Sequence, residues 1–209
     1  MTRLSVNINK IATLRNARGG NVPDVTRAAL NCEKFGAEGI TVHPRPDERH
    51  IRYADVREIR PLIRTEFNIE GNPTVRSFVD LVLEVVPDQV TLVPDGHNAI
   101  TSSAGWNTLE NKSLLTDLCK TFHTKGIRTS IFIDPDPHMA EGAAACGADR
   151  VELYTADYAA GYPLDRRGFH RPRPHFRRPV HGARKNNSGL SWGNPQKITN
   201  FALFTGINY

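Results

Sequence analysis

The sequence predicts an α/β protein built on a parallel β-sheet. Short apolar runs of strand length alternate with amphipathic stretches of helix length, and the pattern repeats at spacings of roughly 20 to 30 residues. The clearest run is Ile40-Thr41-Val42, which is β-branched throughout, follows Gly39 and stops at His43. Alternation of this kind is typical of a sheet whose crossovers are helices.

Six strands follow from the apolar runs. Leu4, Val6 and Ile8 alternate with polar residues and predict the first strand. The second is the run that ends at His43. The remaining strands are predicted at 67–70, 89–93, 128–133 and 150–153. An open doubly wound sheet can have six strands, whereas a closed eight-stranded barrel needs two more.

Five helices are predicted between these strands. Asp24 is a suitable N-cap for the first helix, which Gly36 ends. The others are predicted at 55–64, 74–85 with Thr74 as its cap, 113–125 and 137–146. Two segments are predicted as loops: 10–20, which is rich in cations and amides, and 96–111, which is long enough for a lid or a binding loop.

Titratable residues follow two of the predicted strands. His43 ends the second strand and the loop after it holds Arg45 and His50, while Glu70 ends the third strand. Parallel α/β proteins carry their chemistry at the carboxyl edge of the sheet, although a histidine at a strand end can also simply cap the core. The Gly-rich fingerprints of nucleotide-binding loops are absent from the sequence.

Length and cysteine content suit one domain in a reducing compartment. The 209 residues are enough for a sizeable core. Cys32, Cys119 and Cys146 are scattered and form no C-x-x-C pair, which argues against a disulfide framework or a zinc site. Because no apolar run has the length of a signal peptide or a membrane span, we expect a cytoplasmic protein without a membrane partner.

The charge divides the chain at about residue 163. From Pro163 onward nine Lys/Arg face one acid, a net of +8, so the preceding residues carry −3 of the total +5. Residues 166–185 are rich in Arg, His and Pro and show neither helical nor strand periodicity. We therefore expect a barrel portion at 1–163 and a basic tail at 164–209 that is irregular or disordered.

Ordered motifs in the first 163 residues resemble the pyridoxine 5′-phosphate synthase family of vitamin B6 biosynthesis. The longest is Asn-Ile-Asn-Lys-Ile-Ala-Thr-Leu-Arg-Asn-Ala-Arg-Gly at 7–19. Others lie at 39–45, 49–51, 68–70, 92–94, 130–134, 151–153 and 158–159. The resemblance implies a TIM-type (β/α)8 barrel, incomplete here because only six strands are recognisable, in a homo-octamer.

The resemblance also implies a reaction. The family condenses 1-deoxy-D-xylulose 5-phosphate with 3-amino-2-oxopropyl phosphate to pyridoxine 5′-phosphate, phosphate and water, and needs neither a metal nor an organic cofactor. Proton transfers of this kind suit His and buried Glu, and two phosphates suit Arg and backbone N–H donors.

Roles carried over from the family fall on ten residues. His43 and Glu70 would be proton acceptors, and Glu152 would stabilise a transition state. The substrate-binding residues would be Asn7 and Arg18 for the aminoketone phosphate, and Asn9, Lys10, Arg45, His50 and Thr101 for the deoxyxylulose phosphate.

The sequence departs from the family at two places. Some members have Asp-His where this chain has Asn9-Lys10. The family's C-terminal Asn-Ala-Gly-His segment, which carries a general-acid histidine, and its Gly-His phosphate site are not found, and His170, His175 and His181 stand in a different context. We hypothesise a frameshifted or truncated copy with impaired catalysis; an intact reading frame in the coding region would refute this.

Two other functions are compatible with parts of the sequence. His43, His50 and Glu70 could surround the metal of a barrel hydrolase, but the first strand lacks a His-x-His pair. Alternatively, a non-catalytic remnant could bind nucleic acid through its basic tail, but the tail has few aromatic residues placed for stacking. We expect no nucleic-acid partner.

Overall fold

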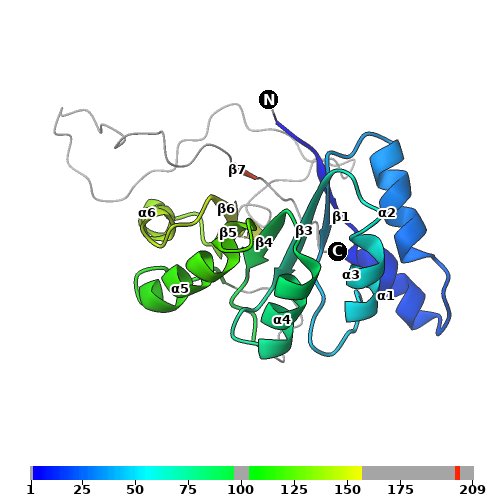
Figure 1. The fold of residues 1–209 in the computed structure, drawn as a ribbon, viewed down its shortest axis with the longest axis horizontal. Helices are drawn as coiled ribbons and strands as arrows, with labels where there is room; N and C mark the ends of the chain where they lie inside the picture. The colour runs from blue at the N-terminus through cyan, green and yellow to red at the C-terminus, as the bar shows by residue number, and fades with distance from the viewer. Residues whose placement is uncertain (1, 97–103, 157–200, 203–209) are drawn as a thin grey trace, which may run out of the picture.

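The computed structural model describes residues 2–96, 104–156 and 201–202 (Figure 1). Seven parallel strands form one sheet, and each strand pairs with the next one along the chain. The strands are β1 (Ser5–Asn7), β2 (Gly39–Val42), β3 (Glu66–Gly71), β4 (Gln89–Leu92), β5 (Arg128–Ile133), β6 (Arg150–Leu153) and β7 (Phe201–Ala202).

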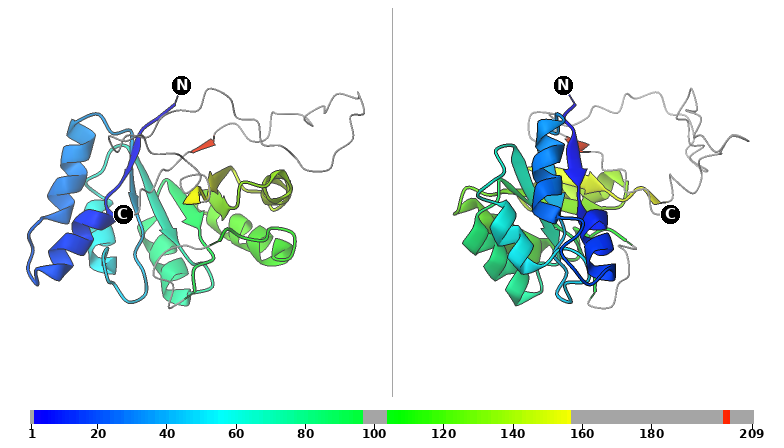
Figure 2. Two further views of the ribbon diagram at one scale, coloured as in Figure 1. Left: turned by 180° about the vertical axis from the view of Figure 1, so that it is seen from behind. Right: turned by 90° about the vertical axis from the view of Figure 1, so that its right-hand side faces the viewer.

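The strand order decides between the two architectures that six strands allow. A doubly wound sheet reverses its strand order at a switch point, whereas the order here is consecutive from β1 to β7. Consecutive right-handed crossovers place their helices on one face of the sheet, as Figures 1 and 2 show. The fold is therefore an incomplete TIM-type barrel, a curled parallel sheet with its helices outside.

Six helices follow the strands, one more than the sequence predicted. They are α1 (Asn9–Ala17), α2 (Val25–Lys34), α3 (Tyr53–Ile59), α4 (Arg76–Val85), α5 (Lys112–His123) and α6 (Pro137–Ala145). The predicted loop at 10–20 was wrong, because most of it is α1. Ile8, Ala12 and Arg15 are buried along one side of α1, and this helical spacing was hidden by the density of polar residues.

The predicted helix caps had mixed outcomes. The Asp24 side chain accepts a hydrogen bond from the backbone N–H of Arg27 and caps α2 as expected. The predicted cap at Thr74 was wrong, since Val75 precedes α4 and the Thr74 hydroxyl donates to the side-chain oxygen of Asn72. Asp55 lies inside the first turn of α3 instead of starting the helix.

The two faces of the sheet differ in polarity. Apolar side chains that alternate along the strands are buried beneath the helices, among them Ile40, Val42, Phe67, Ile69, Val90, Leu92, Ile131, Ile133 and Val151. The opposite face carries polar side chains in a hydrogen-bonded series: Ser5 to Thr41, Thr41 to Asn68, Asn68 to Gln89 and Thr91, and Gln89 to Arg150. Because side chains alternate along a strand, one apolar face can be covered while the other stays polar.

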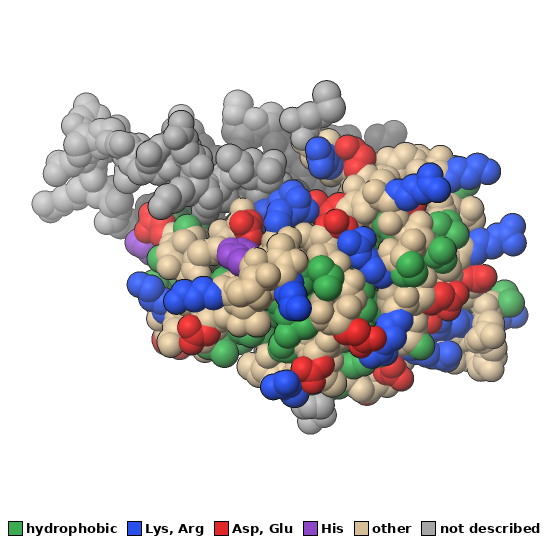
Figure 3. Space-filling view, in the orientation of Figure 1, with side chains coloured by type: hydrophobic (Ala, Val, Ile, Leu, Met, Phe, Trp, Pro, Cys, Tyr) green, Lys and Arg blue, Asp and Glu red, His purple; other side chains and the backbone are tan. Residues whose placement is uncertain are grey.

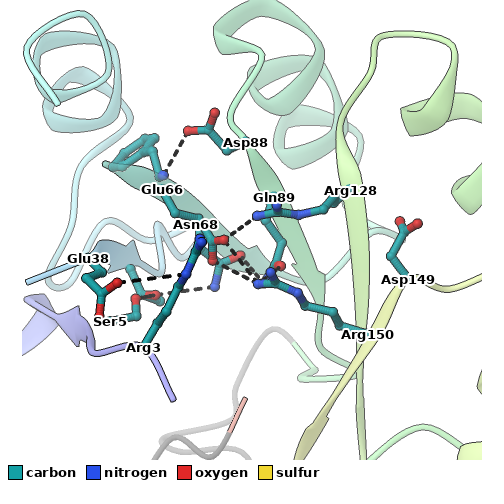
Figure 4. A network of polar contacts seen from close by, with 12 residues as sticks. Arg3, Ser5, Glu38, Glu66, Asn68, Asp88, Gln89, Arg128, Asp149 and Arg150 are labelled. Atoms are coloured by element: carbon teal, nitrogen blue, oxygen red, sulfur yellow. Dashed lines mark hydrogen bonds and ion pairs between the residues drawn. The ribbon is translucent and has the colours of Figure 1, made fainter. Parts of the chain in front are cut away.

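Charged residues join this series near the amino ends of the strands (Figure 4). Glu66 of β3 accepts hydrogen bonds from Arg128 of β5 and from Arg150 of β6, the latter at 3.0 Å. Glu66 therefore links three strands at the end of the sheet opposite to His43.

The face that carries α3, α4 and α5 has charges of both signs (Figure 3). Ion pairs on this face join α3 to α4 and to the segment after it, through Arg57–Glu84 and Arg60–Asp88, and Arg76 pairs with Asp80 within α4. The visible surface shows interspersed charges and no patch of a single sign.

The sequence predicted six strands, and the structure has these six and β7, two residues within the predicted tail that pair with β6. The remainder of the tail at 164–209 and the predicted binding residue Thr101 lie outside the described residues. Within the described ranges, none of the helices is long and apolar enough to cross a membrane.

Candidate active site

Two asparagines connect the end of β1 to the end of β2. Asn7 is the last residue of β1, and its side-chain oxygen accepts from the backbone N–H of Asn9 at 3.0 Å. The side-chain oxygen of Asn9 accepts from the backbone N–H of His43 at 2.9 Å. These hydrogen bonds fix the backbone of His43 against the start of α1.

His43 and Glu70 face each other across β2 and β3. Their closest atoms, His43 Nδ1 and Glu70 Oε2, are 3.8 Å apart, and both residues are buried. Burial, helped by the positive charges of Arg45, His50 and Arg49, lowers the pKa of His43 to about 3.

Glu70 has the opposite shift. Its burial, together with the negative charges of Glu152 and Asp95, raises its pKa well above the ordinary value, while Arg45 acts against this rise. Burial therefore disfavours the charged form of both groups, and at neutral pH the His43 imidazole is neutral. The side-chain amide of Asn7 donates to Glu70 Oε2 at 3.4 Å.

Glu152 of β6 is another buried carboxyl group at this edge of the sheet. Burial raises its pKa to about 7, and the Thr91 hydroxyl moderates the rise. Its Oε2 atom is buried and lacks a hydrogen-bond partner among the described residues. A buried oxygen of this kind is available for a hydrogen bond with a ligand.

His50 lies beside His43 in a positive environment. The centres of the two rings are 6.1 Å apart. Burial and the charges of Arg45 and Arg49 lower the pKa of His50 to about 4, and Lys10 adds to this effect. The Nδ1 atom of His50 is buried and has no hydrogen-bond partner in the described structure. Both histidines are thus neutral at pH 7 in surroundings that favour an anion.

Arg45 forms a buried ion pair that the sequence analysis missed. Its guanidinium donates to the carboxylate of Asp95, with 2.7 Å between Nη2 and Oδ2. The two residues line a small cleft with His43, Pro44, Pro46, Asn72, Val75, Phe78 and Gly96. Asp95 follows β4 just as His43 follows β2, so the strand-end rule that selected His43 could also have found it.

A second buried ion pair holds the loop that carries His50. Arg15 of α1 donates to both carboxylate oxygens of Asp55 at 2.6 and 2.9 Å, and also to the backbone oxygen of His50. The side-chain amide of Asn16 donates to the same backbone oxygen at 2.9 Å. Arg15 and Asn16 of the misassigned segment therefore position this loop.

The other predicted residues lie further from the histidine–glutamate pair. Lys10 is exposed on the first turn of α1, and its charge reaches His50. Arg18 is exposed at the opposite end of α1, where it is the C-cap residue. The structure thus brings together His43, Glu70, Glu152, Asn7, Asn9, Arg45 and His50.

The sequence over most of the chain matches a known family. Residues 4–194 match the model of the pyridoxal phosphate biosynthesis protein PdxJ. The chain belongs to the PdxJ family. A protein of Phocaeicola vulgatus named pyridoxine 5′-phosphate synthase is 69% identical over 163 residues, which cover 78% of this chain and 68% of that protein.

Two further relatives bear the same name. The protein of Bacteroides fragilis is 57% identical over 204 residues, covering 98% of this chain and 84% of the relative. That of Christiangramia forsetii is 65% identical over 162 residues, covering 78% of this chain and 68% of the relative. Family membership confirms the resemblance and a function in vitamin B6 biosynthesis, in which this family acts as a condensing enzyme.

The alternative functions receive no support from these matches. The family model and the relatives described above are named for pyridoxal phosphate biosynthesis and for pyridoxine 5′-phosphate synthase. Among residues 2–96 and 104–156, no three His, Cys, Asp or Glu side chains form a group that could hold a metal ion.

Proposed function

We propose that this chain condenses 1-deoxy-D-xylulose 5-phosphate with 3-amino-2-oxopropyl phosphate to form pyridoxine 5′-phosphate. The observation that carries the proposal is the His43–Glu70–Glu152 group, three buried titratable side chains with shifted pKa values at one edge of the sheet. Perturbed groups clustered in this way are typical of acid–base catalysis.

The pKa shifts indicate a proton-transfer role for each member of this group. His43 is neutral at pH 7 and can accept a proton, and the raised pKa of Glu70 makes its carboxylate a stronger proton acceptor than that of an ordinary glutamate. Glu152, with a pKa of about 7, is divided between both forms and can stabilise developing positive charge when ionised. A condensation with several proton transfers needs both a base and an acid at neutral pH.

The phosphate groups of the substrates have candidate partners around the same edge. Arg45, Lys10 and His50 would bind the deoxyxylulose phosphate with Asn9, and Thr101 would join them. The positive charges that lower the pKa values of both histidines support an anionic ligand here. Asn7 and Arg18 would bind the aminoketone phosphate.

The test is a condensation assay with both substrates and phosphate release as the signal, beside a circular dichroism melt of each sample. His43→Asn and Glu70→Gln should each lower kcat by about 10²- to 10⁴-fold, because each removes a proton-transfer group. Glu141→Gln, an exposed change on α6, is the control and should keep the rate of the unsubstituted chain. Equal rates in all four proteins would contradict the proposal.

The departures at the C-terminus bear on how active this chain is. We propose a barrel portion at 1–163 with a separate tail at 164–209, and a lower rate than in relatives that retain the general-acid histidine. We also propose a homo-octamer, which sedimentation of the purified chain would test, and a cytoplasmic location, which the unpaired thiols of Cys32, Cys119 and Cys146 support.

A further inference from the structure

Asp95 connects three of the loops that form the candidate site. Its carboxylate accepts from Arg45 in the loop after β2, at 2.7 Å. Its backbone oxygen accepts from the side-chain amide of Asn72, which follows β3, at 2.6 Å. Asp95 itself follows β4, and both it and Arg45 are less than one-tenth exposed. The hydrogen bond from Asn72 therefore anchors the backbone of Asp95, whose carboxylate holds the guanidinium.

The ion pair makes it possible for Arg45 to be buried next to His43. A guanidinium taken out of water without a counter-charge costs several kcal/mol, which an adjacent carboxylate offsets. A long side chain such as arginine also loses conformational freedom when it is fixed, and this loss opposes binding. Because Asp95 holds Arg45 in the free protein, that loss does not have to occur when an anion binds.

The same pair balances the charge around Glu70. The negative charge of Asp95 raises the pKa of Glu70, and the positive charge of Arg45 lowers it. A cation for phosphate can thus lie beside the acid–base pair while the pKa of Glu70 stays raised.

We propose that Asp95 is a positioning residue that holds the Arg45 guanidinium in the cleft for the phosphate of the phosphorylated ketose. The inference rests on the proposed function, which gives Arg45 this ligand. The Asp95 carboxylate contacts Arg45, so its removal should weaken ketose binding through Arg45.

The experiment compares Asp95→Asn with Asp80→Asn. Asparagine has nearly the same shape and keeps one oxygen, so the fold should persist, which a melt would verify. Asp80 is an exposed carboxylate on α4 that also accepts from an arginine, Arg76, and is a matched control. Calorimetric titration with 1-deoxy-D-xylulose 5-phosphate should show about tenfold weaker binding for Asp95→Asn. The control should bind like the unsubstituted chain.

Two further variants separate positioning from general damage. Asp95→Glu restores the charge and should recover most of the affinity. In an Arg45→Lys background, Asp95→Asn should change the affinity less than twofold, because the residue that it positions is already gone. Full affinity in Asp95→Asn, or additive losses in the double variant, would overturn the inference.

A second measurement separates this inference from the proposed function. If the unsubstituted chain binds the ketose but forms no product, the proposed function fails and the binding series still decides the role of Asp95. If it binds no ketose, the role of Asp95 is tested by the NMR signal of the Arg45 Nε–H. This signal is assigned by its disappearance in the Arg45→Lys variant. A signal that broadens or exchanges faster in Asp95→Asn supports positioning, and an unchanged signal overturns it.

Discussion

His43 and Glu152 show how burial shifts the pKa values of single side chains in this protein. Burial is the largest cause of both shifts, but it lowers the pKa of the histidine and raises that of the carboxyl group, because in each case it disfavours the charged form. Their contributions to folding stability therefore depend on pH in opposite directions.

The shift of Glu152 predicts a measurable loss of stability as the pH rises. Below its ordinary pKa of 4.5, Glu152 is protonated in both states. Between 4.5 and about 7 the unfolded chain releases this proton while the folded chain keeps it, so the free energy of unfolding falls across this window. The fall amounts to about 3 kcal/mol on the scale of 1.4 kcal/mol per pKa unit.

Glu152→Gln should remove that fall. Urea unfolding gives the change in the free energy of unfolding between pH 5 and pH 8 for each protein. Comparing this change in the variant and in the unsubstituted protein cancels the opposite contribution of His43, which both proteins share. Glu141→Gln, on the exposed side of α6, should lose as much stability over this range as the unsubstituted protein. If the Glu152 variant lost the same amount too, the carboxyl group would not be protonated in the folded state.

Helix α1 and the start of α3 are joined by the buried pair of Arg15 and Asp55. Their side chains are 6% and 11% exposed, and the contact spans 40 positions of the sequence. Since Arg15 also donates to the backbone oxygen of His50, this contact fixes both the packing of the two helices and the position of a site residue.

Removing only the charge of Asp55 should be costly. Asp55→Asn keeps an oxygen for the backbone N–H of Arg52 but leaves Arg15 buried without its counter-charge. A broken buried pair typically costs roughly 3–5 kcal/mol, which chemical unfolding would measure. Asp80→Asn, which breaks an exposed pair, should change stability by less than about 1 kcal/mol. Similar small values for both would show that the buried pair contributes little.

The whole protein is a curled sheet with a polar inner face and a helix-covered outer face. The buried apolar cluster is drawn from β1 to β6 and from the helices between them, all within residues 2–156. The two residues of β7 add one short pairing to β6. Among the residues whose burial the structure describes, the apolar core thus lies within the first 156.

A chain that ends at Pro163 should therefore still melt cooperatively. For a protein of this length about 1 kcal/mol corresponds to 2–4 °C, and we expect the shortened chain to melt no more than about 5 °C below the full chain. Circular dichroism of the shortened and full chains measures this. A shortened chain without a cooperative transition would refute the division at 163.

Much of this protein was determined by local sequence. Alternation and β-branching located the six principal strands, and the rule that chemistry follows parallel strands selected His43 and Glu70, which the structure places 3.8 Å apart. These features depend on residues within a few positions of each other, and for that reason they can be recognised from the sequence alone.

Only the tertiary structure decided how distant charges are paired and which groups keep their protons. Arg15 was assigned to a cation-rich loop because its partner, Asp55, is 40 positions away, and the pairing of Arg45 with Asp95 spans 50 positions. The raised pKa of Glu70 follows from burial and from the charges of Glu152 and Asp95, and that of Glu152 follows from burial. Burial and through-space charge exist only once the chain has folded, so neither has a signature in the local pattern of residues.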